Sequence, residues 1–179
     1  AGELSLVGDI GFSWARAFGA SGADEATAVV VDPAGNVTIA GMFSGTVDFD
    51  PSPTATTALT AAGERDIFLV KLDPSGALLW ARAIGGPQTE YVRTMVQDAA
   101  GHLYLAGSFA GQVDFDPGAS SRTLGAAGES DLFVVKLTAA GDLVWAQALG
   151  GAAHEQATSL AVDAAGDVYL GGFFTGTLD

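Results

Sequence analysis

The chain has 179 residues, of which 49% are hydrophobic and 16% are charged, proportions that are typical of an ordered globular protein. It carries 21 acidic residues against seven lysines and arginines. The resulting net charge of −14 would repel a phosphate backbone, so a nucleic-acid partner is not expected. The absence of cysteine excludes disulfides, thiolate metal sites and a cysteine nucleophile.

The composition also bears on secondary structure and on partners. Twenty-five glycines and six prolines favour short strands and tight turns over helices. No apolar run approaches the ~18 residues of a membrane span, and a secretion signal is either absent or already removed. The acidic charge suits a cation, a basic protein surface or an uncharged glycan, or it serves solubility alone.

A recurring tryptophan segment shows that the chain is a repeat array. Trp14, Trp80 and Trp145 are 66 and 65 residues apart, each in a segment that ends in glycine, and the residues between them return in the same order. We therefore predict a lead-in segment at 1–11, a strand at 12–19, full repeats at 20–85 and 86–150, and a partial repeat at 151–179.

Each repeat contains the signals of four antiparallel strands. A short apolar run ends at an Asp-x-x-Gly turn, where the aspartate can accept a backbone N–H and the glycine can take a positive φ. The next strand has a glycine two positions before its last phenylalanine, which indicates a bulge or a close backbone approach. A long connection, an apolar third strand, a second tight turn and the tryptophan strand follow. The first turns lie at 32–35, 98–101 and 163–166, the second strands at 37–43, 103–109 and 168–174, and the third strands at 67–72 and 132–137.

These strands are apolar on both faces, so each sheet must be covered on both sides. Stacking such sheets around an axis achieves this, and the predicted fold is an all-β β-propeller of four-stranded antiparallel blades. A parallel β-helix would need coils much shorter than 65 residues. We count eleven strands, or about 2.75 blades, against the ~4–8 of a closed ring. The chain is therefore expected to be a segment of a longer protein or to complete its ring with other copies.

Three motifs carry a resemblance to a known family. Residues 98–105 (DAAGHLYL), 113–118 (VDFDPG) and 131–137 (DLFVVKL) resemble the bacterial β-propeller repeat family often called SBBP, and the resemblance extends over residues 12–179. It implies a secreted or cell-surface bacterial protein, often a module of a larger chain. It carries no catalytic motif.

The long connections contain paired aspartates that could bind a metal. Asp48 and Asp50 lie two residues apart on an expected strand, so their carboxylates would project on one side ~6.5–7 Å apart. With acidic residues returning at the far end of the connection, a calcium clip is one hypothesis, and capping of turns is the alternative. The candidate metal ligands are Asp48, Asp50, Asp66, Asp114, Asp116 and Asp131.

A second acidic set follows the tryptophan segments. Glu25, Glu90 and Glu155 lie in loops that share one end of the blades with the long connections. If the first strand of each blade is innermost, these glutamates would ring the axis as a ligand face for a cation or a basic ligand. The alternative is that each glutamate caps a backbone N–H or meets a nearby arginine such as Arg93.

The remaining candidates favour structural roles. Lys71 and Lys136 recur inside apolar strands, where a lysine typically reaches the rim or pairs with a carboxylate. His102 and His154 occupy non-equivalent positions and form no metal triad, although His154 beside Glu155 is a candidate acid/base pair. The tryptophans could stack on sugars, but core or inter-blade packing is the expected role.

Together these features predict a non-catalytic extracellular module that binds or scaffolds a protein or glycan at the cell surface, with calcium as a candidate cofactor. The first alternative is a self-assembling structural protein whose incomplete blades pair between chains. The second is a fragment of a carbohydrate-active propeller enzyme, such as a lyase or hydrolase. An active site should break the repeat symmetry, and only His154, Arg93 and Gln97 stand out in that way.

Overall fold

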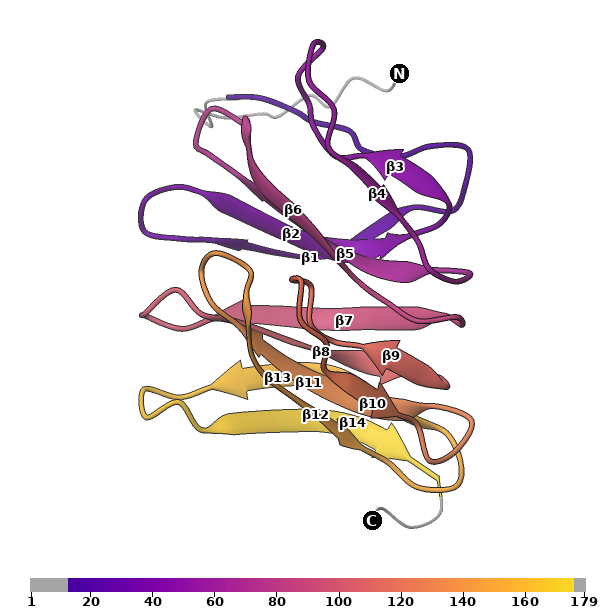
Figure 1. The fold of residues 1–179 in the computed structure, drawn as a ribbon. Helices are drawn as coiled ribbons and strands as arrows, with labels where there is room; N and C mark the ends of the chain where they lie inside the picture. Colours follow the sequence, from indigo (N-terminus) through magenta and orange to yellow (C-terminus); the bar gives the residue numbers. More distant parts are fainter. Residues whose placement is uncertain (1–12, 176–179) are drawn as a thin grey trace, which may run out of the picture.

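The computed structural model describes residues 13–175, and over that range it is all-β, with antiparallel strands and no helix (Figure 1). Two four-stranded sheets and one hairpin follow each other along the chain. The predicted lead-in segment at 1–11 lies outside the described residues. The first sheet has the order β1-β2-β5-β6 and the second the order β7-β8-β11-β12, while β13 and β14 form the C-terminal hairpin.

The strand bounds agree closely with the predicted repeat. The first sheet consists of β1 (Glu25–Val31), β2 (Val37–Phe43), β5 (Asp66–Leu72) and β6 (Leu78–Ile84). The second consists of β7 (Glu90–Gln97), β8 (Leu103–Phe109), β11 (Asp131–Leu137) and β12 (Leu143–Leu149). The C-terminal hairpin consists of β13 (Glu155–Val162) and β14 (Val168–Phe174).

The Asp-x-x-Gly turns have the predicted geometry. In the turn between β1 and β2, Asp32 Oδ1 accepts the N–H groups of Ala34 and Asn36 at 3.0 and 2.9 Å, and Gly35 takes a φ of 84°. That left-handed conformation favours glycine because it has no Cβ. The turns at 98–101 and 163–166 repeat this pattern, so the aspartate and the glycine explain why each hairpin reverses there.

The fixed glycine of the second strand marks both a bulge and a close approach. The register between β7 and β8 shifts between Val92 and Thr94, opposite Gly107. A Cβ at Gly107 would overlap the carbonyl oxygen of Tyr91 and crowd the ring of Phe133. The same shift occurs in β1 and in β13, so the prediction of a bulge at this position is confirmed.

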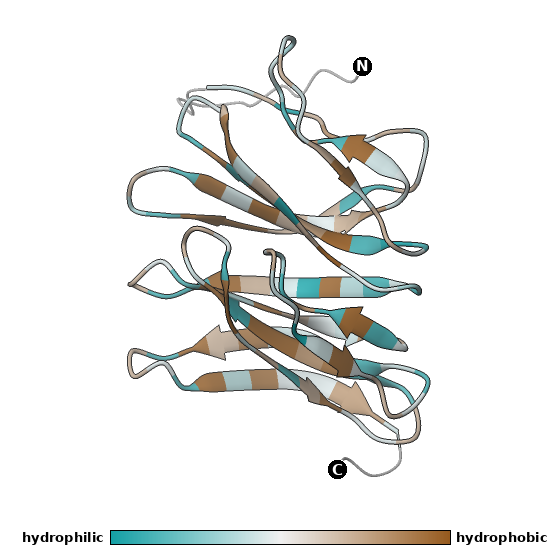
Figure 2. Cartoon of the chain, viewed as in Figure 1, coloured by the Kyte–Doolittle hydropathy of each residue, from teal (hydrophilic) through white to brown (hydrophobic). Residues whose placement is uncertain are grey.

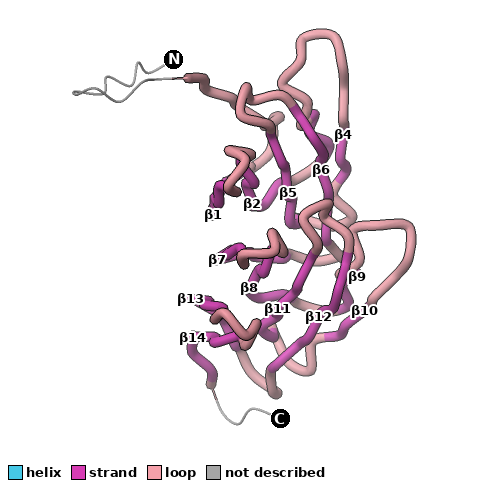
Figure 3. Tube along the Cα trace, turned by 90° about the vertical axis from the view of Figure 1, so that its left-hand side faces the viewer, coloured by secondary structure: helices cyan, strands magenta, loops and turns pink. Residues whose placement is uncertain are grey.

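The sheets stack face to face, which covers the apolar faces that the sequence predicts. One core cluster joins Met42 and Leu69 of the first sheet to Leu105, Phe133 and other residues of the second. In Figure 2 the hydrophobic residues lie mainly on the strands and the hydrophilic ones mainly at the turns. Figure 3 shows β1, β7 and β13 in one column at one edge of the stack, with β6 and β12 at the opposite edge.

The first tryptophan segment is not a strand. Within the predicted strand 12–19, residues 13–19 form no strand, and residue 12 lies outside the described residues. Trp14 instead donates from Nε1 to the carbonyl oxygen of Pro74 at 3.0 Å, and Phe18 packs on Phe49. The segment thus covers the outer face of the first sheet, but it has no neighbouring strand with which to form a ladder.

The long connections contain two short hairpins that the sequence did not reveal. They consist of β3 (Thr46–Asp48) with β4 (Ala58–Thr60), and of β9 (Gln112–Asp114) with β10 (Thr123–Gly125). Each strand has only three residues, too few for a readable alternation. Among residues 13–175 no helix is long and apolar enough to span a membrane.

Candidate functional site

The aspartates of the long connections act as turn caps. Asp48 Oδ1 accepts the N–H groups of Asp50 and Thr57 at 3.0 and 2.9 Å, and these hydrogen bonds lower the pKa of the carboxyl group. Asp50 Oδ1 accepts the N–H of Ser52 at 2.8 Å. Asp114 and Asp116 repeat the arrangement with the N–H groups of other residues in the second connection. These four side chains therefore hold the loops in shape.

Asp66 and Asp131 cap the ends of the same connections. Asp66 accepts the N–H groups of Ala62 and Gly63 at 2.8 and 3.3 Å, and Asp131 accepts the equivalent pair from Ala127 and Gly128. In the part of the chain that is described, no three His, Cys, Asp or Glu side chains come together as a metal-binding group. The geometry thus favours the capping alternative over the calcium clip, which stays an untested hypothesis.

The glutamate set needs a correction of register. Counting from each tryptophan, the residue equivalent to Glu90 and Glu155 is Asp24, not Glu25. Asp24 Oδ2 accepts the N–H of Ala20 at 2.8 Å, as Glu90 and Glu155 accept the N–H four residues earlier at 3.2 and 3.1 Å. Glu25 is one position later and exposed, and it lies 3.6 Å from Arg65 Nη2. The prediction that Glu25 belongs to a ring of equivalent glutamates is wrong.

Glu90 and Glu155 are fully buried instead of facing a ligand. In each of them Oε2 accepts one backbone N–H, whereas Oε1 is buried without a hydrogen-bond partner. Burial, together with the nearby carboxylate of Asp66, raises the pKa of Glu90 to about 8. Burial also raises the pKa of Asp66. Near neutral pH the favoured state of Glu90 is therefore the neutral acid, which is a poor ligand for a cation.

Two of the three side chains that break the repeat symmetry, Arg93 and His154, lie in one place. We call it the long-loop hollow, a cavity of about 570 Å³ at the long-loop end of β7 and β13. It is lined by residues that include Tyr91, Arg93, Ser108, Ser130, His154 and Gln156. The position of Arg93 is occupied by Thr27 and Thr158 in the neighbouring repeats, so the guanidinium occurs once.

Arg93 is held by neighbours on two strands, β7 and β13. Its guanidinium carbon lies 5.0 Å from the ring centroid of Tyr91, a cation–π contact. When the amide oxygen of Gln156 faces the guanidinium, it accepts hydrogen bonds from Arg93 Nη2 and Nε at 2.9 and 3.1 Å, the orientation that satisfies both groups. The two strands β7 and β13 thus orient a single positive charge toward the hollow.

The rim of the hollow contains His154 in a different role from the predicted one. Its Nδ1 is hydrogen-bonded to Ser130 Oγ, and its ring lies 5.7 Å from that of Phe173. Glu155 points away to cap Gly151, so the candidate acid/base pair of His154 with Glu155 does not form. Across the hollow, Thr89 donates to Glu64 Oε2 at 3.1 Å.

Sequence reasoning found Arg93 and His154 as symmetry-breaking residues but missed their partners. Tyr91 and Gln156 stand at the same repeat position, which Glu25 occupies in the first repeat. The three repeats therefore have three different residues at this strand position, a difference that the sequence alone could have revealed. Gln97, which was also singled out, lies at the other end and donates to the carbonyl oxygen of Gly101 at 3.1 Å.

The lysines and tryptophans have structural roles. Lys71 Nζ lies 3.0 Å from Asp32 Oδ2 and is almost fully buried, and Lys136 approaches Asp98 in the same way. Trp80 packs against Gly141, in the turn of the next sheet. His102 Nδ1 contacts Asp98 Oδ2 at 2.9 Å, so it supports a turn at the end opposite the long-loop hollow.

Comparison with known proteins adds two partial likenesses. No family model matches the chain. The regulatory protein FlaEY of Caulobacter vibrioides is 30% identical over 110 residues, which are 62% of this chain and 12% of that protein. An uncharacterized WD repeat-containing protein of Acanthamoeba polyphaga mimivirus is 26% identical over an alignment of 190 residues that covers 94% of this chain and 14% of that protein.

The chain therefore spans less than a sixth of the length of either relative. The likeness to a WD repeat-containing protein agrees with an all-β repeat fold of four-stranded antiparallel sheets. The resemblance to the SBBP family finds no support in these matches and stays a prediction.

Proposed function

We propose that the chain is a non-catalytic module of β-propeller type that binds a glycan in the long-loop hollow. In this proposal each sheet is one blade of the propeller, and β1, β7 and β13 line its axis. A secreted or cell-surface location belongs to the same proposal and rests on the SBBP resemblance alone. Calcium would have no part in ligand binding, because the candidate aspartates cap their own loops.

The observation that carries the proposal is that Arg93 and His154, two of the three side chains that break the repeat symmetry, line one cavity. A structural residue of a repeat recurs, as the turn aspartates and the lysines do. Arg93 and His154 do not recur, and both line the long-loop hollow. A local departure from the repeat at a concave polar surface is typical of a binding site.

The lining favours a glycan over other ligands. Amide, hydroxyl, imidazole and guanidinium groups offer both donors and acceptors at close spacing, and Tyr91 adds an aromatic surface. The single guanidinium suits a neutral sugar or one carboxylate. The net charge of −14 would repel a polyanion.

Isothermal titration of the chain with a panel of tetrasaccharides, neutral or with one uronic acid, tests this proposal. We expect binding by one member and a loss of at least tenfold in affinity for Arg93→Ala, about 1.4 kcal/mol. Arg122→Ala is the matched control, because Arg122 is exposed and lies outside the lining of the hollow. Equal affinity of Arg93→Ala and the unchanged chain would refute the assignment of the site.

One observation favours an enzyme as the second candidate. Ser130 and His154 are hydrogen-bonded at the rim of the hollow, as a nucleophile and its base would be. Within residues 13–175, however, no carboxylate is hydrogen-bonded to His154 to orient it. An ester hydrolysis assay separates the two candidates, because an enzyme would lose its activity in Ser130→Ala, whereas a binding module shows none before or after the change.

A further inference from the structure

The long-loop hollow lies at one of two equivalent junctions in the chain. At the first junction, between the first and the second sheet, Arg65 forms an isolated parallel bridge with Thr89. At the second junction, between the second sheet and the C-terminal hairpin, Ser130 forms the same bridge with His154. The repeat therefore allows the two junctions to be compared position by position.

The hollow lies where two long side chains of the first junction are replaced by serines. Met42 is fully buried in the core cluster between the first two sheets. Its equivalent, Ser108, is 2% exposed and lines the hollow. Ser130, the equivalent of Arg65, lines it as well. The space that the longer side chains occupy at the first junction is thus open to a ligand at the second.

The second junction also has a cation without a carboxylate. At the first junction, Arg65 Nη2 lies 3.6 Å from Glu25 Oε2. The equivalents of that ion pair are Ser130 and Tyr91, which carry no charge near neutral pH. Arg93 adds a guanidinium here, and within residues 13–175 no carboxylate lies within ion-pair distance of it.

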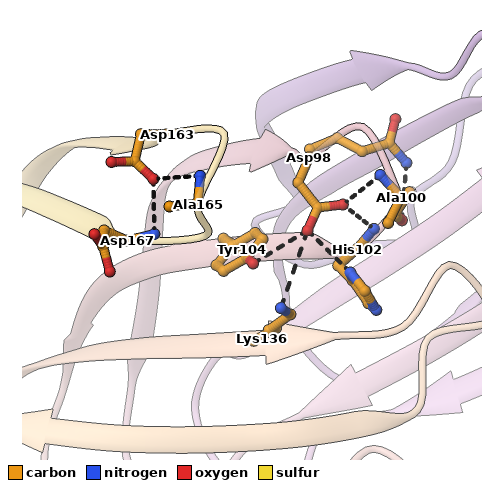
Figure 4. Close-up of polar contacts among 10 residues, drawn as sticks. Asp98, Ala100, His102, Tyr104, Lys136, Asp163, Ala165 and Asp167 are labelled. Carbon is orange, nitrogen blue, oxygen red and sulfur yellow. Dashed lines mark hydrogen bonds and ion pairs between the residues drawn. The ribbon is translucent and has the colours of Figure 1, made fainter.

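The two lysines of the chain, in contrast, have carboxylate partners. Lys71 Nζ lies 3.0 Å from Asp32 Oδ2. Lys136 Nζ lies 4.0 Å from Asp98 Oδ2, at the end of the strands opposite the hollow (Figure 4). At both of these turns the chain itself supplies the negative charge, which it does not do for Arg93.

The guanidinium of Arg93 presents one edge that matches a carboxylate. The amide oxygen of Gln156 accepts from Nε and Nη2 and so occupies the first edge of the guanidinium plane. The second edge, formed by Nη1 and the other N–H of Nη2, is left for a ligand. Two parallel N–H donors of this kind bind the two oxygens of a carboxylate at once, whereas a hydroxymethyl group offers one oxygen.

We propose, as an inference that rests on the proposed function, that the glycan in the long-loop hollow carries one hexuronic acid. Its carboxylate binds bidentately to Arg93, and its ring lies against Ser108 and Ser130. A buried hydroxyl costs free energy unless it is hydrogen-bonded, and the hydroxyl groups of the sugar provide partners for that of Ser108. Glu64, exposed in the lining of the hollow, and the net charge of −14 disfavour a polyanion.

Isothermal titration tests the proposal with tetrasaccharides that contain one uronic acid, each compared with its methyl ester and with the matched neutral tetrasaccharide. We expect the acid to bind at least tenfold more tightly than either matched form. Arg93→Gln removes the positive charge and should abolish this preference. Arg122→Gln, at an exposed position outside the hollow, is the control and should keep it.

A second variant tests where the sugar lies. Ser108→Met restores the residue of the first junction, where the methionine is fully buried without a ligand. It should weaken binding of the acidic tetrasaccharide at least tenfold, while the midpoint of urea denaturation does not fall. The comparison of Arg93→Gln with the unchanged chain remains decisive if Ser108→Met proves unstable.

The results that overturn the inference differ from those that overturn the proposed function. Equal affinity for the acid, its ester and the neutral tetrasaccharide would overturn the inference and leave a glycan-binding module. Absence of binding by every tetrasaccharide would overturn both. Undiminished binding by a stably folded Ser108→Met chain would show that the sugar does not lie against Ser108.

Discussion

The buried side chain of Glu90 provides the sharpest test of the packing between the first and the second sheet. It is fully buried at the start of β7, and one of its oxygens has no partner. This burial, with a smaller contribution from the nearby carboxylate of Asp66, raises the pKa of Glu90 to about 8. The folded chain therefore holds a proton that the unfolded chain releases above pH 4.5. The free energy of unfolding falls as the pH rises from 4.5 to about 8 and is lowest above that window.

The change to make is Glu90→Gln, which keeps an acceptor for the N–H of Gly86 and cannot ionise. A pKa of about 8 against 4.5, at 1.36 kcal/mol per pKa unit, corresponds to on the order of 5 kcal/mol. Relative to the unchanged chain, the variant should gain stability by that order between pH 4.5 and pH 8.5. The same change at the exposed Glu129 is the control and should leave the profile unaltered.

Urea denaturation at a series of pH values measures the effect. The refuting result is a stability difference between Glu90→Gln and the unchanged chain that stays constant with pH, or one that shrinks as the pH rises. Either outcome would mean that Glu90 is ionised in the folded chain and reaches water or a counter-charge.

Three further predictions concern the repeat itself. Gly107→Ala should destabilise the chain by about 1–3 kcal/mol or more in urea, because its Cβ would overlap the carbonyl oxygen of Tyr91. A smaller loss would contradict the close approach. Lys71→Met should lower the melting temperature by several degrees, since Asp32 loses its ion pair. An unchanged melting temperature would show that the ion pair of Lys71 with Asp32 does not stabilise the fold. Chelation of calcium should leave the melting temperature unchanged, and a fall would revive the calcium clip.

The repeat made the sheets predictable, because each signal was local and recurred. The aspartate and glycine of every turn, and the glycine facing the bulge, specify backbone geometry within a few residues. The prediction of a strand at 12–19 was wrong because strand formation there depends on tertiary contacts. The segment around Trp14 has the residue pattern of a strand, but a strand also needs a neighbour with which to form hydrogen bonds. The pattern does not show whether such a neighbour is present.

The candidate site was harder to predict because a carboxylate can either bind a ligand or cap a backbone N–H group. Asp48 and Glu90 look like ligands in the sequence, yet both face backbone N–H groups of their own loops. The distinction depends on where the side chain points, which the sequence does not give. Arg93 was recognisable as a departure from the repeat, whereas its packing on Tyr91 and Gln156 depends on the stacking of β7 and β13.

The binding role of the long-loop hollow is tested most directly by nuclear magnetic resonance, with the backbone amides followed as the best-binding tetrasaccharide is added. Shifts that cluster at Tyr91, Arg93, His154 and Gln156, and that disappear in Arg93→Ala, are the predicted result. Shifts confined to the capped aspartate loops or to β14, or no shifts at all across the panel, would contradict it.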